Sequence, residues 1–218
     1  MADFKPIFEN TLKKEGGFQK FSDDSANYVN GVLIGTNRGI SAQAYYTFYG
    51  RVPTEADMKA LSQDQAYQIF KKNYWNKING DKIKNQSVAA MMFQFIIGSG
   101  ASQLSDLKDI ANKVNGKDVL SSNDTPFTDS QIEFINGLNQ LKYWEALKKW
   151  RHEFYIKLVA KKPGLKKFLN GWQSRLNSYV FKDDSGIQNL ANNAGKVLVF
   201  FFALSLIGVG AYISVNKS

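Results

Sequence analysis

The sequence predicts an all-α protein with one small β-hairpin excursion near its N-terminus and a separate apolar segment at its C-terminal end. Three observations support this prediction. Apolar residues recur at spacings of three and four along most of the chain, which is typical of amphipathic helices. The pair Asn30-Gly31 stands between short β-prone runs, the strongest local signal for a tight hairpin. Residues 197–215 contain no charged side chain.

The first half of the chain divides into a helix, a hairpin and three further helices. Phe4, Ile7, Phe8 and Leu12 share one helical face, and this helix is expected to close at Gly16. After the hairpin, helix starts are indicated by a polar residue that can cap the backbone N–H groups, in two cases followed three residues later by Asp or Gln. The predicted caps are Ser41, Thr54 with Asp57, and Ser62 with Gln65.

The second half continues with helices alone. The run "VAAMMFQFIIG", residues 88–98, is too short to cross a membrane and predicts a central core helix, preceded by Ser87. Further helices are expected after Ser102 and after Thr128, which has Gln131 three residues later, and then over 141–162 and 165–180. We therefore expect a first lobe over 1–104, a second helical lobe over 105–181 and a linker over 182–195.

The C-terminal segment has the length of a membrane span. Its 19 uncharged residues, 197–215, lie between Lys196 and Lys217. At about 1.5 Å per residue they form roughly 28 Å of helix, close to the roughly 30 Å hydrocarbon thickness of a bilayer. The run is apolar on every face, with three consecutive phenylalanines. Residues 196–218 are therefore predicted to be a single transmembrane anchor, which implies a lipid membrane as a partner.

Composition excludes several classes of chemistry. The chain has no cysteine, so a disulfide framework, a thiolate nucleophile and a sulfur-ligated metal are impossible. Its one histidine, His152, lies in a helical run and is predicted to be a structural or surface residue, so we expect no metal and no cofactor. The net charge of +9 favours a polyanionic partner. Nucleic acid is not expected, because no basic run is interleaved with base-stacking aromatics.

Acid–base chemistry therefore falls to carboxylates, and Glu15 is the first candidate. It continues the apolar face of the first helix and stands in its last turn, before Gly16 and Gly17. Partial burial and the negative end of the helix dipole both disfavour the charged form, so we expect a raised pKa. A carboxylic acid that stays protonated at neutral pH can donate a proton to a leaving-group oxygen.

Glycosidic chemistry also needs a second acid or a positioned water on the opposite side of the sugar. Asp23 and Asp24 lie in the excursion that the hairpin would fold over the end of the first helix. Thr36, in "GTNRGIS", is a candidate to orient the water. Arg38 beside it would hold the aspartate or contact the glycan.

Six motifs in order resemble glycoside hydrolase family 108, the bacterial and phage N-acetylmuramidases. They are "KKEGGF", "GTNRGIS", "KKNYW", "MMFQFIIGSG", "RHEFY" and "GWQSR", and the resemblance covers residues 5–178. It implies a lysozyme-like helical fold that cleaves peptidoglycan glycan strands, with Glu15 in the place of the catalytic glutamate. The second lobe of the family resembles a peptidoglycan-binding module, which residues 105–138 match poorly. Phe18 stands where the family usually has Tyr, and the usual Asp-Pro-Gly-Gly is missing after the glutamate.

Three further residues are predicted to line a sugar-binding cleft. Tyr74 and Trp75 end the helix that follows Ser62, where an aromatic ring can stack on a sugar. Gln94 is an amide inside an apolar helix, and a buried amide needs hydrogen-bonding partners that a cleft can supply.

The predicted function is a membrane-anchored muramidase that cleaves the bond between N-acetylmuramic acid and N-acetylglucosamine, for phage lysis or entry. Its membrane would be a bacterial inner membrane or the internal membrane of a virion. Two alternatives remain open. One is a lytic transglycosylase, in which the muramic 6-hydroxyl replaces water; the other is an inactive structural or virion membrane protein that retains the fold.

Overall fold

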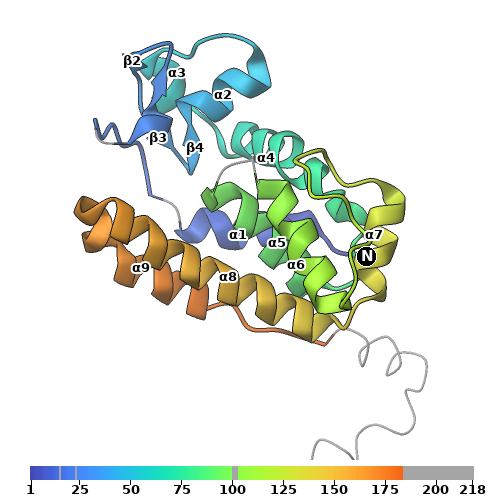
Figure 1. Ribbon diagram of the computed structural model, residues 1–218. Coiled ribbons are helices and arrows are strands. Elements are labelled where there is room, and N and C mark those ends of the chain that lie inside the picture. The colour runs from blue at the N-terminus through green and yellow to red at the C-terminus, as the bar shows by residue number, and fades with distance from the viewer. Residues whose placement is uncertain (15, 23, 100–102, 184–218) are drawn as a thin grey trace, which may run out of the picture. The chain divides into compact units, whose positions relative to one another are not determined.

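Helix α5 (Gln86–Ser99) is apolar on all its faces, and such a helix is stable in water only when other elements cover it on every side. Met91, Met92 and Phe93 are completely buried. In Figure 1, α5 lies in the middle of the molecule, between α1 behind it and the long α8 below it. This confirms the predicted core helix. Its first turn is capped by Asn85, whose side-chain oxygen accepts a hydrogen bond from the backbone N–H of Val88 at 2.9 Å.

The structure is a computed structural model that describes residues 1–14, 16–22, 24–99 and 103–183. The remaining elements of the first half are α1 (Phe4–Lys14), η1 (Ser25–Asn27), β1 (Tyr28–Val29), β2 (Val32–Leu33), β3 (Thr36–Asn37), β4 (Ile40–Ser41), α2 (Ala42–Tyr49), α3 (Glu55–Lys59), α4 (Gln63–Asn73), η2 (Trp75–Ile78) and η3 (Gly80–Lys82). After α5 follow α6 (Leu104–Asn115), α7 (Asp129–Gly137), α8 (Gln140–Lys161), η5 (Pro163–Leu165) and α9 (Lys166–Asn177).

Four of the predicted helix caps, Ser41, Thr54, Ser62 and Thr128, are confirmed. The start predicted at Ser87 is wrong by one residue, because α5 begins at Gln86 with Asn85 as its cap. Ser102 lies outside the described residues. Thr54, Ser62 and Thr128 each accept a hydrogen bond from the backbone N–H three residues later, and the side-chain oxygen at that position accepts one from the backbone N–H of the cap. Ser41 accepts from the backbone N–H of Ala44. These bonds satisfy donors that would otherwise have no partner at the helix start.

The excursion contains two hairpins where the sequence indicated one. Strands β1 and β2 pair antiparallel around Asn30 and Gly31, which have φ values of 51° and 80°. Strands β3 and β4 pair in the same way around Arg38 and Gly39, at 52° and 75°. Two successive residues with positive φ form the turn that matches the twist of a two-stranded ribbon. Because the second turn begins with an arginine, which rarely adopts positive φ, its sequence signal is weak.

The core runs without a break across the boundary predicted between residues 104 and 105. Leu104, Leu107 and Ile110 on α6 belong to the same buried cluster as Phe4 and Phe93. The chain after α9 then returns to the start of α5, where the backbone N–H of Lys182 donates to the Ser87 hydroxyl at 2.9 Å. Residues Met1–Lys182 accordingly form one compact unit, and the two predicted lobes share one core.

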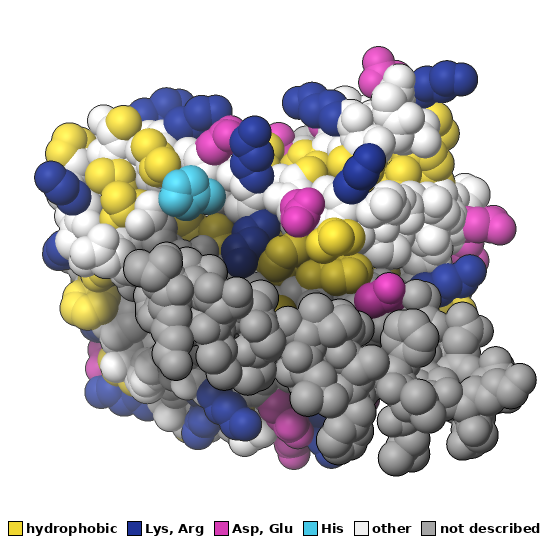
Figure 2. Space-filling view, turned by 90° about the horizontal axis from the view of Figure 1, so that it is seen from below, with side chains coloured by type: hydrophobic (Ala, Val, Ile, Leu, Met, Phe, Trp, Pro, Cys, Tyr) yellow, Lys and Arg dark blue, Asp and Glu magenta, His cyan; other side chains and the backbone are white. Residues whose placement is uncertain are grey.

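His152 is exposed on α8, and it is the cyan group on the surface in Figure 2.

The predicted anchor, residues 196–218, lies outside the described residues, as does all but the first part of the predicted linker. Within residues 1–14, 16–22, 24–99 and 103–183, no helix combines the length and the apolar character that a membrane crossing requires.

Lys108 on α6 is a charged side chain with no exposed surface. Its ammonium group donates to the backbone carbonyls of Asn123 at 3.0 Å and Thr125 at 2.9 Å, and to the Asn123 side-chain oxygen at 2.6 Å. It also lies 5.2 Å from the centre of the Phe127 ring. Burial lowers the pKa of Lys108, because an ammonium ion loses hydration there. The lysine thereby fastens the segment between α6 and α7 to the body of the protein.

Replacing Lys108 by Met should lower the free energy of unfolding by about 2 kcal/mol, because two backbone carbonyls lose their donor. Urea denaturation measures this change as a lower midpoint at constant slope. Lys113→Met, on an exposed position of the same helix, should change the free energy by less than about 0.5 kcal/mol. Equal midpoints for the two variants would contradict the role assigned to Lys108.

Candidate active site at the end of the first helix

The chain before position 15 is held by a hydrogen bond from the core helix. Thr11 lies in the last turn of α1, four residues before Glu15 in the sequence, and is 2% exposed. Its hydroxyl donates to the Ile7 carbonyl at 2.8 Å and accepts from the side-chain N–H of Gln94 at 2.6 Å. Gln94 is buried on α5, and its backbone carbonyl accepts a hydrogen bond from Arg151 of α8. The last turn of α1 is thus fixed to α5, and α5 in turn to α8.

The chain after position 15 is held by a β-bridge. Gly16 and Gly17 are exposed, and the chain then pairs with the excursion: Gln19 and Thr36 exchange two backbone hydrogen bonds, each of 2.8 Å. Position 15 therefore lies four residues after the contact at Thr11 and four residues before the bridge at Gln19. Glu15 and Asp23 themselves lie outside the described residues.

Asn27 organises the excursion around this bridge. It is completely buried, and its side-chain oxygen accepts from the Thr36 hydroxyl at 2.5 Å. Its side-chain N–H group donates to the Phe21 carbonyl at 2.9 Å, while its backbone carbonyl accepts from the N–H groups of Ile34 and Gly35. The Asn27 side chain, at the end of η1, thus connects the segment after α1 with β3. A single buried asparagine in a polar stretch has no distinguishing sequence pattern, so it was not among the predicted site residues.

Phe18 and Gly35 make the closest approach in the excursion. A β-carbon built on Gly35 would lie 2.7 Å from the Gln19 carbonyl oxygen and 2.8 Å from the Phe18 ring, and Gly35 has a φ of 122°. The Phe18 ring also lies under the Lys59 ammonium, which is 5.1 Å from the ring centre. Phe18, the departure from the family motif, is therefore accommodated by packing against a glycine.

An ion-pair cluster connects Lys20, in the segment after α1, to α3. The Glu55 carboxylate contacts the ammonium groups of Lys20 and Lys59, each at 2.7 Å. Hydrogen bonds from Lys20 and then Lys59 lower the pKa of Glu55 to about 2. Because the folded pKa is depressed, the pairs persist at neutral pH and are lost as the pH falls toward 2.

Two predicted catalytic partners, Asp24 and Thr36, lie on the excursion as expected. The Asp24 carboxylate caps η1 by accepting from the backbone N–H of Ala26 at 3.0 Å. The Thr36 hydroxyl gives its proton to Asn27, so its remaining lone pairs can accept a hydrogen bond from a water molecule. Both residues are connected through Asn27, because the backbone N–H of Asn27 donates to the Asp24 carbonyl at 3.0 Å.

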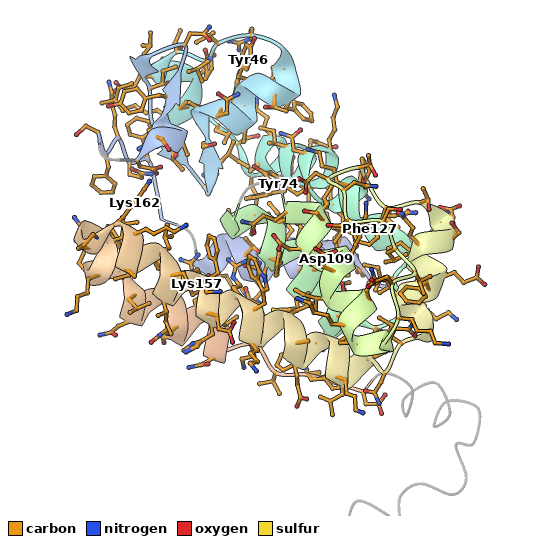
Figure 3. All side chains as sticks on the ribbon, viewed as in Figure 1. Tyr46, Tyr74, Asp109, Phe127, Lys157 and Lys162 are labelled. Atoms are coloured by element: carbon orange, nitrogen blue, oxygen red, sulfur yellow. The ribbon has the colours of Figure 1, made fainter. Side chains whose placement is uncertain are left out.

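Three of the predicted sugar-contacting residues, Arg38, Trp75 and Tyr74, lie in different environments. Arg38 donates from its Nε atom to the Leu61 carbonyl at 2.9 Å and so supports the connection between α3 and α4. Trp75 is completely buried, with Gly80 against its ring and its indole N–H on Asp81 at 2.8 Å, so it has no free face on which a sugar could stack. Tyr74, labelled in Figure 3, is partly buried against Phe70, and burial raises its pKa.

Gln94 also borders a surface hollow of about 270 Å³. This hollow includes Ile7 and Asn10 of α1, Trp144 of α8 and the returning segment at Val180. Thr11, the excursion and Tyr74 are not part of its wall. We therefore distinguish it from the candidate active site at the end of α1.

A first helix that ends beneath two short hairpins, beside a buried central helix, is consistent with a lysozyme-like helical fold. The family model described as Glycosyl hydrolase 108 matches residues 8–100, which run from α1 to the end of α5. This match supports a glycoside hydrolase of the N-acetylmuramidase type, and it confirms the resemblance over that part of the chain. The two late motifs, "RHEFY" and "GWQSR", fall beyond it.

The structure is also similar to the solved structure described as Structure of Brucella abortus SagA. The TM-score is 0.59, with 22% sequence identity over 81% of this chain and 94% of that chain. At this identity the likeness concerns the fold. None of the curated proteins compared with this chain matches it.

Gly35→Ala should disrupt the bridge between Gln19 and Thr36, because the added methyl group overlaps a backbone oxygen. We expect a loss of at least about 2 kcal/mol in the free energy of unfolding, combining backbone strain with the overlap. Thermal unfolding measures the change. Gly31→Ala is the matched control, since Gly31 also has positive φ but has open space around it, and it should cost about 1 kcal/mol. Equal losses for the two variants would show that the close approach is unimportant.

Proposed function

We propose that this glycoside hydrolase is an N-acetylmuramidase that cleaves peptidoglycan glycan strands with Glu15 as its general acid. The observation that carries the proposal is the pair of contacts around position 15: Gln94 on Thr11 before it, and Thr36 on Gln19 after it. A catalytic acid needs a main chain that keeps its place while substrate binds. The family match over residues 8–100 supports the reaction class.

In the proposed reaction, Glu15 protonates the oxygen that bridges N-acetylmuramic acid and N-acetylglucosamine. Water completes hydrolysis at the sugar carbon, and its leftover proton passes to the second group of the site or to solvent. Asp24 and Thr36 are the two candidates to align this water, since both lie on the excursion and both are connected to Asn27. Comparing the activity of Asp24→Asn with that of Thr36→Val assigns the role: the water-aligning residue is the one whose loss lowers kcat while folding is unchanged.

Glu15→Gln should lower the release of reducing ends from purified peptidoglycan by about 10²- to 10⁴-fold, because the amide cannot donate the proton. Glu9→Gln is the matched control, since Glu9 is an exposed glutamate of α1 and its loss should leave the rate unchanged. Full activity of Glu15→Gln would remove Glu15 from the mechanism. A wild-type protein that binds peptidoglycan but never cleaves it would instead favour the inactive structural alternative.

Mass analysis of the same products separates hydrolysis from transglycosylation. Hydrolysis adds a water molecule at each cleaved bond and leaves a reducing end. A lytic transglycosylase leaves a 1,6-anhydro end, because the muramic 6-hydroxyl attacks in place of water. We propose hydrolysis, in keeping with the N-acetylmuramidase type that the family match supports.

The proposal includes membrane anchoring through residues 197–215, on the basis of their 19 uncharged residues. The bacterial inner membrane or the internal membrane of a virion would then hold the enzyme until phage lysis or entry. Flotation with uncharged phosphatidylcholine vesicles tests the anchor: the full chain should float, and it should stay with the vesicles in high salt. A full chain that remains at the bottom of the gradient would contradict the span.

A further inference from the structure

The net charge of the protein is confined to one part of the chain. Residues 1–140 contain 15 basic and 15 acidic side chains, and residues 183–218 contain two of each. Residues 141–182, which form most of α8 together with η5, α9 and the returning segment, contain 11 basic and two acidic side chains. The whole excess of +9 therefore belongs to this region, while the region with the candidate active site is neutral overall.

Five lysines concentrate this charge where α8 turns into α9. They are Lys157, Lys161, Lys162, Lys166 and Lys167, and all five are exposed. Among the residues that the structure describes, none of the five takes part in an ion pair. Figure 3 labels Lys157 and Lys162 at this end of α8. Unpaired charges of one sign in close sequence create a positive potential that attracts a polyanion.

Apolar side chains are exposed among these lysines. Ile156 on α8 is 48% exposed and Phe168 on α9 is 39% exposed. The Phe168 ring lies under the Lys167 ammonium, at 4.9 Å, and stacks on Trp172 at 5.9 Å. Figure 2, which views the molecule from below, shows hydrophobic side chains gathered beside the histidine of α8, with Lys and Arg around them. We call Ile156, Phe168 and the five lysines the α8–α9 face.

We propose that the α8–α9 face docks the folded unit onto an anionic lipid bilayer. Lysines attract anionic headgroups and extend their charged ends toward water, while an isoleucine and a phenylalanine between them can enter the boundary between headgroups and acyl chains. An anionic wall polymer would also be attracted to the lysines. It would not bind the exposed isoleucine beside them, since saccharides are recognised by hydrogen-bonding groups and flat aromatic faces.

The length of the chain beyond the described residues agrees with this occupant. Thirteen residues, 184–196, separate Asp183 from the start of the apolar segment. Even fully extended they reach about 45 Å, so the folded unit would stay within one protein diameter of the membrane surface. This proximity, unlike the charge distribution, depends on the span proposed above. Docking through the α8–α9 face would give the enzyme a set orientation on the membrane and not only a tether.

A fluorophore on the α8–α9 face tests the docking in the full chain. Because the protein has no cysteine, Ala160→Cys carries a single environment-sensitive label on an exposed position of α8. In vesicles with 30% phosphatidylglycerol the emission should shift to the blue and rise about twofold or more, as the label leaves water. In pure phosphatidylcholine vesicles, and in either lipid at 0.5 M salt, it should not. Ala56→Cys, on exposed α3, should show no change in any vesicle.

Charge-matched variants of Ala160→Cys complete the test. Replacing Lys161, Lys162, Lys166 and Lys167 by Gln should reduce the anionic-lipid response at least about tenfold. The control replaces four other exposed lysines, Lys5, Lys84, Lys113 and Lys117, and should keep the response. Equal responses of the two variants would overturn the proposal. So would an emission change of the same size when anionic wall polymer is added in place of anionic lipid. Failure of the anchor alone would appear separately, as loss of protein from phosphatidylcholine vesicles.

Discussion

The two backbone hydrogen bonds between Gln19 and Thr36 are the constraint on which the candidate site depends. They pair the segment that follows α1 with β3 and so fix the position of this segment on the excursion. Two exposed glycines, Gly16 and Gly17, lie between α1 and the bridge. Asn27 also holds this contact together, because its side chain forms hydrogen bonds with the side chains of Gln19 and Thr36 and with the Phe21 carbonyl.

The other side of the junction depends on α5. A helix that is apolar all round gains stability on every face that becomes covered, so α8, η2 and the aromatic rings of α1 and α4 pack against it. Gln94 is a buried polar residue on this helix, and its side-chain amide donates a hydrogen bond to the Thr11 hydroxyl of α1. A buried amide is costly unless bonded, so this contact resists sliding of α1 along α5. The hydrophobic core and the polar junction thus fix the same short stretch of chain from opposite sides.

The separation of charge gives the two halves of the protein different physical characters. A neutral region carries the candidate active site, and a strongly basic helical pair carries the net charge. Lysines scattered over the surface would contribute only to solubility. Their gathering at one turn, beside exposed Ile156 and Phe168, makes that turn a surface with its own binding properties. Such a surface can orient an enzyme on a membrane without taking part in the reaction.

Local signals predicted the helices well because they act over three or four residues. The caps at Thr54, Ser62 and Thr128 and the turn at Asn30-Gly31 are interactions between near neighbours in sequence. The site residues were predicted less completely, because their roles depend on partners far along the chain. Trp75 stands beside Tyr74 in sequence, yet only its packing against Gly80 and Phe93 shows that it belongs to the core.

By itself, therefore, the sequence determined the helical class, most helix starts, one of the two hairpins and the buried character of α5, since periodicity, capping and turn chemistry are local. It also identified the motif around Glu15. Only the tertiary structure decided that Asn27 connects the excursion, that Gln94 bonds Thr11, and that Arg38 turns to Leu61. Each of these is a hydrogen bond between groups distant in sequence, and a polar side chain has many possible partners until packing brings one of them within reach.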